Sequence, residues 1–160
     1  MNALALARQQ WRWLPPMLAL ALLAGTVVGA QEAGKTAATE AETLFQRGMA
    51  ALPSRDDDPQ KKAKFEAGLA LFQKAVQKAP SFAVAHLQVG YCLRNLGRST
   101  EAIKAYKEAI RLQPDLAKPH YILGVAYAVQ GERGLALEEY KILKDLDKDL
   151  AAELFDLLYP

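Results

Sequence analysis

Residues 83–116 have the sequence AVAHLQVGYCLRNLGRSTEAIKAYKEAIRLQPDL, and residues 117–150 have the sequence AKPHYILGVAYAVQGERGLALEEYKILKDLDKDL. Laid over one another at an offset of 34 residues, the two segments agree at His86 and His120, Gly90 and Gly124, Gly97 and Gly131, Ala102 and Ala136, and Tyr106 and Tyr140. A repeat of about 20 to 50 residues is typical of a solenoid. Neither segment can bury its apolar face alone, so we expect the two to stack on each other and on their flanks.

Apolar residues recur at helical spacing along most of the chain. This periodicity predicts helices over residues 40–52, 59–79, 82–96, 99–112, 116–130, 133–146 and 150–158. Gly97 and Gly131 fall in the short turns between helices, where a glycine can end a helix in the left-handed conformation. The pattern therefore predicts pairs of helices followed by a short final helix, with Leu150, Leu154 and Leu157 along one side of the latter.

Several polar residues are candidates for capping helix starts. Residues 39–42, Thr-Glu-Ala-Glu, have the form of a capping box and predict that the first helix begins there. Ser81, Asp115 and Asp149 are spaced 34 residues apart, each just before a helical apolar pattern, so we predict that they cap the helices that follow. The acidic run 56–58 ends in Asp58-Pro59, which predicts a further capped start and a solvated loop in place of a cation site.

Small residues recur at matched positions inside the predicted helices. Two helices approach closely where side chains are small, so residues 90, 102, 124 and 136 are expected at helix contacts. Tyr106 and Tyr140 are expected to fill the remaining gaps.

These residues resemble the tetratricopeptide repeat, a family whose units pair two helices. The middle segment matches the family pattern at His86, Val89, Gly90, Leu93, Ala102, Tyr106, Ala109 and Pro114. The last segment matches it at His120, Leu123, Gly124, Tyr127, Ala136 and Tyr140, whereas Leu143 and Lys148 replace the later Ala and Pro. A first unit, with an insertion at 53–60, matches at Leu44, Gly48, Ala51, Gly68, Phe72, Ala75 and Pro80.

The resemblance covers residues 40–150 and implies an all-α fold, an α-α superhelix or solenoid. It implies a repeat domain over 39–160, with three helix pairs and a capping helix. The boundaries expected for the repeats and the cap are about 41–82, 83–116, 117–150 and 150–158.

The first thirty residues have the features of a secretory signal. Arg8 and Arg12 are followed by an apolar run that ends in small residues, which predicts cleavage after Ala30 and export to a bacterial periplasm. Residues 31–38 are small and polar and are expected to be a flexible leader. The alternative is that residues 14–30 stay uncleaved as an inner-membrane anchor, because this run is at the lower length limit for a span.

The balance of charges excludes some classes of partner. From Gln31 onward the chain has 18 basic and 18 acidic side chains, so no basic field is left to bind nucleic acid. The single cysteine, Cys92, cannot form a disulfide within the chain, although it could pair between chains if it were exposed.

In the resembled family, the first helix of each pair lines a concave groove that holds a peptide or a partner helix. Carried over to this chain, the groove residues are Phe45, Met49, Leu87, Tyr91, Arg94, Asn95, Lys118, Tyr121, Val125 and Ala128. Such a surface suits a partner with apolar side chains. Leu87 and Tyr91 stand where some members bind a terminal carboxylate with polar residues, which argues against an acidic chain end. The alternative is that Phe45, Leu87 and Val125 only fill gaps between helices.

No constellation of catalytic residues is recognisable. The chain lacks a glycine-rich phosphate loop and a Ser/His/Asp set, so we expect neither an enzyme nor a cofactor. His86 and His120 lie one repeat apart, about 10 Å between helices, which is too far for a shared zinc ion and favours a packing role. The sequence thus predicts a protein interaction module, an adaptor or scaffold. The alternative is a membrane-anchored or self-associating structural subunit.

Overall fold

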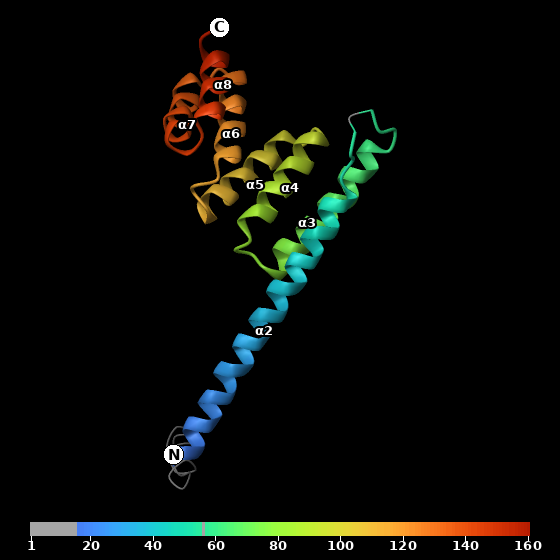
Figure 1. Cartoon of the computed structure of the whole chain (residues 1–160), viewed down its shortest axis with the longest axis vertical. Coiled ribbons are helices and arrows are strands. Elements are labelled where there is room, and N and C mark those ends of the chain that lie inside the picture. Colours follow the sequence, from blue (N-terminus) through green and yellow to red (C-terminus); the bar gives the residue numbers. More distant parts are fainter. Residues whose placement is uncertain (1–15, 56) are drawn as a thin grey trace, which may run out of the picture. The chain divides into compact units, whose positions relative to one another are not determined.

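The computed structural model describes the backbone of residues 16–55 and 57–160, and the side chains of residues 34–55 and 57–160. All regular structure in these ranges is helical, as the sequence predicts (Figure 1). The helices are α2 (Pro16–Ala51), α3 (Lys61–Lys78), α4 (Ala83–Asn95), α5 (Ser99–Leu112), α6 (Ala117–Val129), α7 (Arg133–Leu146) and α8 (Lys148–Leu158). Residues Thr39–Pro160 form one compact unit, and the chain up to Ala38 belongs to another.

Helix α2 begins earlier than the capping box predicts. It runs without a break through residues 31–38, the predicted leader, and through Thr39. The Thr43 hydroxyl donates to the Thr39 carbonyl at 2.9 Å, one helical turn back, so the predicted helix start at Thr39 is wrong. The physical reason is that nothing in this alanine-rich stretch interrupts a helix, and a capping box acts only where the backbone leaves helical geometry.

The predicted signal segment, residues 1–30, and its cleavage after Ala30 lie outside the residues whose side chains are described. Within the described part of the chain, no helix combines the length and apolar character that crossing a membrane requires. The predicted anchor at 14–30 falls largely outside that part, and cleavage and anchoring both stay predictions.

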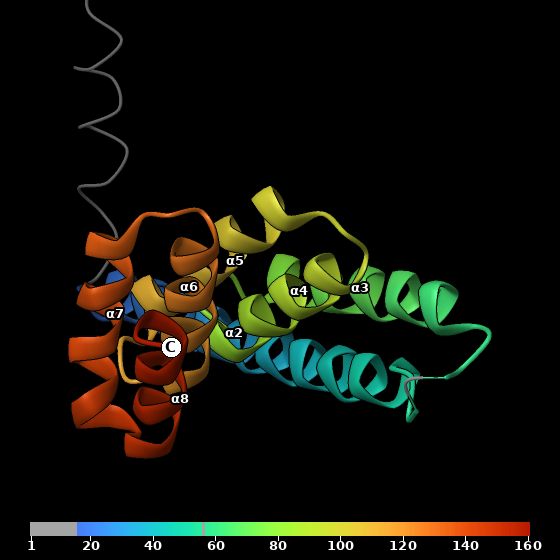
Figure 2. The same ribbon diagram turned by 90° about the horizontal axis from the view of Figure 1, so that it is seen from above.

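The compact unit consists of three helix pairs and a final helix. The end of α2 pairs with α3, α4 pairs with α5, and α6 pairs with α7, while α8 packs against α6 and α7 (Figure 2). The turns within the second and third pairs contain Gly97 and Gly131, with φ of 78° and 79°. In the first turn, Arg98 N–H donates to the Leu93 carbonyl at 2.9 Å. This left-handed helix ending, confirmed in both turns, needs glycine because it has no Cβ.

Three of the predicted caps are wrong. Helices α4 and α6 begin after Phe82 and Leu116, and no side chain caps either start, so Ser81 and Asp115 do not serve as N-caps. Phe82 packs its ring on Phe45 with centroids 5.1 Å apart, so interior packing determines where α4 begins. Asp149 is likewise no cap, because Asp147 accepts from the amides of residues 149 and 150 and starts α8 two residues early.

At the start of α3, the Asp58 carboxylate accepts from Gln60 N–H at 2.8 Å and from the Lys64 ammonium at 2.5 Å. Both hydrogen bonds, the one from Lys64 first, lower the pKa of Asp58. The helix nevertheless begins at Lys61, two residues later than predicted, and Asp58 stabilises the turn before it.

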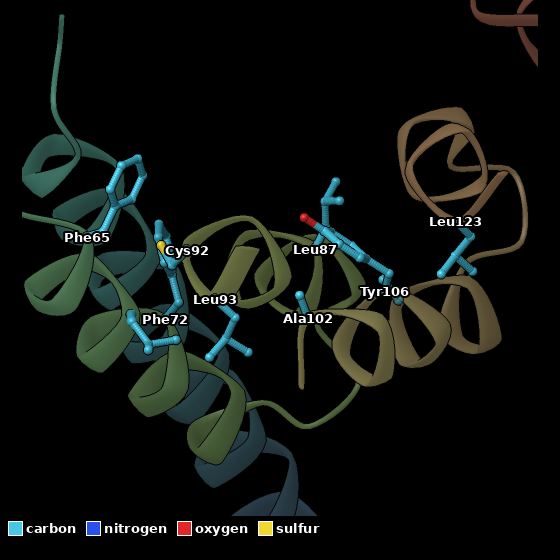
Figure 3. Packing of buried hydrophobic residues seen from close by; sticks show 10 residues of the cluster. Phe65, Phe72, Leu87, Cys92, Leu93, Ala102, Tyr106 and Leu123 are labelled. Carbon is cyan, nitrogen blue, oxygen red and sulfur yellow. The ribbon is translucent and has the colours of Figure 1, made fainter. Parts of the chain in front are cut away.

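Glycines let large rings close the helix contacts. A Cβ on Gly90 would lie 2.6 Å from Tyr106 Cε1, and a Cβ on Gly48 would lie 2.6 Å from Phe72 Cε1. Tyr106 and Phe72 are both fully buried (Figure 3). The predicted close approach at residue 90 is therefore confirmed, and Tyr106 fills the gap as expected, while Ala102 is buried.

The last pair is packed differently from the prediction. Leu154 of α8, and not Tyr140, lies against Gly124, while Tyr140 is half-buried beside Phe155 with ring centroids 5.7 Å apart. Within α8, Leu158 is buried and Leu157 is 48% exposed, so the predicted inner face is wrong at Leu157. The buried positions of α8 are Ala151, Leu154 and Leu158, which are spaced three and four residues apart and so lie on one face of the helix.

Candidate functional site

The first helices of the three pairs and the start of α8 enclose a hollow of about 500 Å³, here called the main groove. Its walls are largely apolar and aromatic, with two cations among them. The lining residues are Met49 from α2 and Leu52 just after it, Leu87, Gln88, Tyr91 and Arg94 from α4, Lys118, Tyr121 and Ile122 from α6, and Leu150 from α8. Each pair contributes to this face because stacking presents the same helix of every repeat on the same side.

A second hollow of about 330 Å³, here called the adjoining pocket, lies between the second and third pairs. Arg94, Tyr121 and Ile122 line both hollows, so the two are neighbouring parts of one surface. The other lining residues are Ser99, Ala102, Ile103 and Tyr106 from α5, Val125, Ala126 and Val129 from α6, and Gln130.

Most of the predicted groove residues are brought together. Six of them line the main groove, namely Met49, Leu87, Tyr91, Arg94, Lys118 and Tyr121. Val125 lines the adjoining pocket. Leu87 is only 9% exposed, so it forms the floor of the groove more than its surface.

Three predicted residues line neither hollow. Phe45 packs against Phe72 and Phe82, with ring centroids 5.5 and 5.1 Å away, so the gap-filling alternative describes it. The Asn95 amide donates to the Tyr91 carbonyl at 2.8 Å, one turn back along α4. Ala128 packs on the core of the last pair.

Other lining residues were missed by sequence reasoning. Leu52 lies past the last groove position carried over for the first repeat, and Leu150 belongs to the capping helix. Tyr106 was expected only to fill a gap between helices, and repeat spacing gave no sign that a hollow reaches Tyr106 or Ile122. The one-sided apolar pattern of α8 signalled that it covers the open end, but not that its first turn completes the groove wall.

The cations in the main groove are not neutralised by neighbours. Neither Arg94 nor Lys118 forms an ion pair with any described residue. The Arg94 guanidinium lies 5.7 Å from the centroid of the Tyr91 ring, a cation–π distance. Burial, and then a hydrogen bond to Glu153 of α8, raise the pKa of the Tyr121 hydroxyl, so this tyrosine joins the groove to the capping helix.

A family model for the TPR repeat matches residues 90–131, which run from Gly90 in α4 to Gly131 in the turn after α6. The resemblance to the tetratricopeptide repeat is therefore confirmed over these residues. The matched residues include the Gly97 turn, the whole of α5 and the Tyr106 contact.

Solved structures support the same fold. The crystal structure of MamA matches with a TM-score of 0.58 and 23% sequence identity, over 72% of this chain and 63% of that one. The second TPR of Spaghetti (RPAP3), bound to the HSP90 peptide SRMEEVD, matches with a TM-score of 0.60 and 18% sequence identity. The match covers 72% of this chain and 99% of that one. A CopN-Scc3 complex matches with a TM-score of 0.58 and 19% sequence identity, over 73% of this chain and 68% of that one. The search of curated proteins found no match.

The two histidines, His86 and His120, connect successive helix pairs. His86 Nε2 lies 3.0 Å from the Pro80 carbonyl, and His120 Nε2 lies 3.0 Å from the Pro114 carbonyl. A carbonyl oxygen only accepts, so Nε2 carries the hydrogen in both rings. Each ring thereby fastens a repeat to the proline that ends the preceding one. No group of three or more metal-binding side chains occurs among the described residues.

Cys92 lies in the interior beside this surface. It is fully buried, and burial raises the pKa of its thiol to about 12. Because the thiolate is the reactive form, this thiol is protected from oxidation while α4 stays folded. Pairing between chains would require that α4 opens first.

Proposed function

We propose that this chain is a protein interaction module that binds an extended or helical segment of a partner protein in the main groove. The observation that carries the proposal is the set of side chains that packing leaves uncovered there. Met49 is 41% exposed, Tyr91 and Tyr121 are half-buried, and Lys118 has no ion pair with a described residue. Partly covered aromatic and apolar side chains beside unpaired charges are typical of binding sites.

Two of the similar structures support this interpretation. One is a TPR bound to a peptide and another is a complex of two proteins. In the present chain, the groove walls come from helices that are packed on both sides. The partner would therefore bear most of the entropy cost of docking, since the site is already ordered.

The test uses substitutions that change the groove without removing packed rings. Met49→Asp with Lys118→Glu alters two exposed side chains of the main groove. The matched control is Ile142→Asp with Lys141→Glu, because Ile142 is also 41% exposed and neither control residue lines either hollow. Immobilised protein is used to capture partners from its source cell, followed by calorimetry with the captured partner.

We expect the groove variant to lose binding at least tenfold, while the control variant binds as the unmodified chain does. Equal binding by both variants would show that partners use another surface. Circular dichroism of both variants checks that the helical content is unchanged.

We further propose that the chain acts after export, as a periplasmic adaptor with its signal removed after Ala30. The supporting observation is the order of basic, apolar and small residues in the first thirty positions. Sequencing the N-terminus of the exported product tests it. A start at Gln31 supports a free adaptor, whereas an intact N-terminus in the membrane fraction would favour the anchored structural subunit.

A further inference from the structure

The hydroxyl of Tyr106 is a buried polar group for which the described residues offer no hydrogen-bond partner. Tyr106 is 1% exposed, and Gly90 allows its ring to lie flush against α4. A buried hydroxyl without a partner destabilises a folded protein, because water bonded to it in the unfolded state. A phenylalanine would fill the same space without that cost, so the hydroxyl calls for an explanation.

This hydroxyl lies next to the proposed binding surface. Tyr106 itself lines the adjoining pocket. In Figure 3 its ring extends from α5 with the oxygen directed toward Leu87, which lines the main groove. Tyr106 therefore lies at the junction of the two hollows, both of which are lined by Arg94, Tyr121 and Ile122.

Arg94 places a positive charge beside the same point. Burial raises the pKa of Tyr106 to about 12, and the nearby Arg94 charge opposes that increase. Arg94 is exposed and forms no ion pair with a described residue, so its side chain can move aside or turn inward at little cost. The Glu153 carboxylate of α8 interacts with the Tyr121 hydroxyl, whose pKa burial and then Glu153 raise.

At this place the protein offers hydrogen-bond donors, while the described residues supply no acceptor for the Tyr106 hydroxyl. The Tyr106 hydroxyl and the guanidinium both donate hydrogen bonds, and a carboxylate is the acceptor that satisfies both and also neutralises the charge. The rest of the adjoining pocket is apolar, with Ile103, Ile122 and Val125 among its walls. A ligand that fits both parts has a carboxylate next to an apolar side chain.

Building on the groove function proposed above, we propose that the partner segment is anchored by an internal aspartate or glutamate side chain. Its carboxylate accepts hydrogen bonds from Tyr106 Oη and the Arg94 guanidinium, and a neighbouring apolar side chain of the partner fills the adjoining pocket. Lys118, farther along the main groove, favours a second acidic residue in the same segment.

The experiment starts from a phage library of random twelve-residue peptides selected on the full mature chain. The best binder is synthesised with acetylated and amidated ends, which removes both terminal charges, together with versions in which each acidic residue becomes its amide. Dissociation constants are measured for the unmodified chain, Tyr106→Phe, Arg94→Gln and Tyr140→Phe. Tyr140 occupies the same repeat position as Tyr106 but lines neither hollow, so Tyr140→Phe is the matched control.

We expect one acid-to-amide change in the peptide to weaken binding about tenfold or more, the size typical of a hydrogen bond to a charged group. Tyr106→Phe is expected to weaken binding of the acidic peptide by a similar factor. The urea unfolding midpoint of this variant is expected to stay equal or to rise. Tyr140→Phe binds unchanged. In Arg94→Gln, the acidic and amide peptides are expected to bind almost alike.

Two results would overturn the carboxylate anchor alone. One is that the peptide binds Tyr106→Phe as tightly as the unmodified chain, and the other is that binding requires a free terminal carboxylate on the peptide. Either result counts against the anchor alone when Met49→Asp with Lys118→Glu still abolishes binding. If that groove variant binds the selected peptides normally, or if the library yields no binder, both the anchor and the groove function are rejected.

Discussion

The middle helix pair, α4 and α5, and the last pair, α6 and α7, carry the same residues at equivalent positions but pack them differently. In the middle pair, Gly90 receives the ring of Tyr106 from the same repeat. In the last pair, Gly124 receives Leu154 from the capping helix, and Tyr140 stays half-buried. The same glycine and tyrosine thus serve an internal contact in one repeat and a contact with the cap in the next.

The histidines differ in the same way. For His86, the one hydrogen bond described is to the Pro80 carbonyl. The residue at the repeat position equivalent to Glu139 is Ala105, which has no side-chain acceptor to offer. His120 has a second bond, 2.6 Å from Nδ1 to the Glu139 carboxylate, and is 4% exposed. The comparison teaches that a repeat motif specifies where a contact is needed, while the neighbouring helix decides what fills it.

The sharpest test of the comparison is to truncate the two equivalent tyrosines. Tyr106→Ala is expected to lower the free energy of unfolding by about 4 kcal/mol, because it empties a fully buried aromatic site. Tyr140→Ala is expected to cost about 1 to 2 kcal/mol, since its ring is only half-buried. Urea unfolding of both variants measures the difference. Equal losses would mean that the two repeats are packed alike after all.

The contact between Gly124 and Leu154 predicts that Gly124→Ala destabilises the unmodified chain but stabilises the Leu154→Ala variant. Leu154→Ala removes a fully buried side chain and is expected to cost about 3 kcal/mol. Gly124→Ala alone places a methyl group against Leu154 and should destabilise by about 1 to 2 kcal/mol. Added to Leu154→Ala, however, it should stabilise by up to about 1 kcal/mol, because the clash is gone and alanine favours the helix.

Gly134→Ala is the control for this sign change. Gly134 lies in α7 with open space around its Cα, so alanine should stabilise it in any background by about 1 kcal/mol or less. If Gly124→Ala were harmless in the unmodified chain, Leu154 would not be the residue that fills the last gap. Urea midpoints of the four combinations measure the coupling.

The smallest effect is expected at the Glu139 carboxylate. Glu139→Ala gives the last repeat the residue that the middle repeat has at Ala105, and it leaves Nδ1 of the buried His120 without its acceptor. The expected cost is about 1 to 2 kcal/mol. Its exposed neighbour is the control, since Glu138→Ala should change stability by less than about 0.5 kcal/mol. A similar loss in both would mean that helix propensity, and not the histidine contact, explains the effect.

Local signals predicted the repeated elements well. The helices expected over 99–112 and 133–146 are α5 and α7 to the residue, and the turns at Gly97 and Gly131 are confirmed. These elements were predictable because the periodic apolar face specifies the helix and the glycine specifies its end, and both signals come from residues that are neighbours in sequence. Capping predictions failed at Ser81 and Asp115 because the apolar residue after each one packs inward and takes the N-cap position.

The candidate groove could be predicted only in part. Positions such as Tyr91 and Tyr121 follow from repeat spacing, and the structure brings them into one hollow. Phe45 occupies an equivalent position but packs on Phe72 and Phe82. Phe82 is an additional aromatic neighbour, because the next repeat has Leu116 at that position. Leu150 enters the groove from α8, and no repeat rule describes a helix outside the repeats.

The sequence by itself determined the helix pairs, their turns and the positions of the small residues where helices meet. These features depend on the apolar periodicity and on the backbone freedom of glycine within one repeat. Only the tertiary structure decided that Leu154 replaces Tyr140 over Gly124, and that the Tyr106 hydroxyl lies unpaired beside Arg94. The reason is that these contacts join residues from different helices, and their outcome depends on which neighbour fits the space first and most completely.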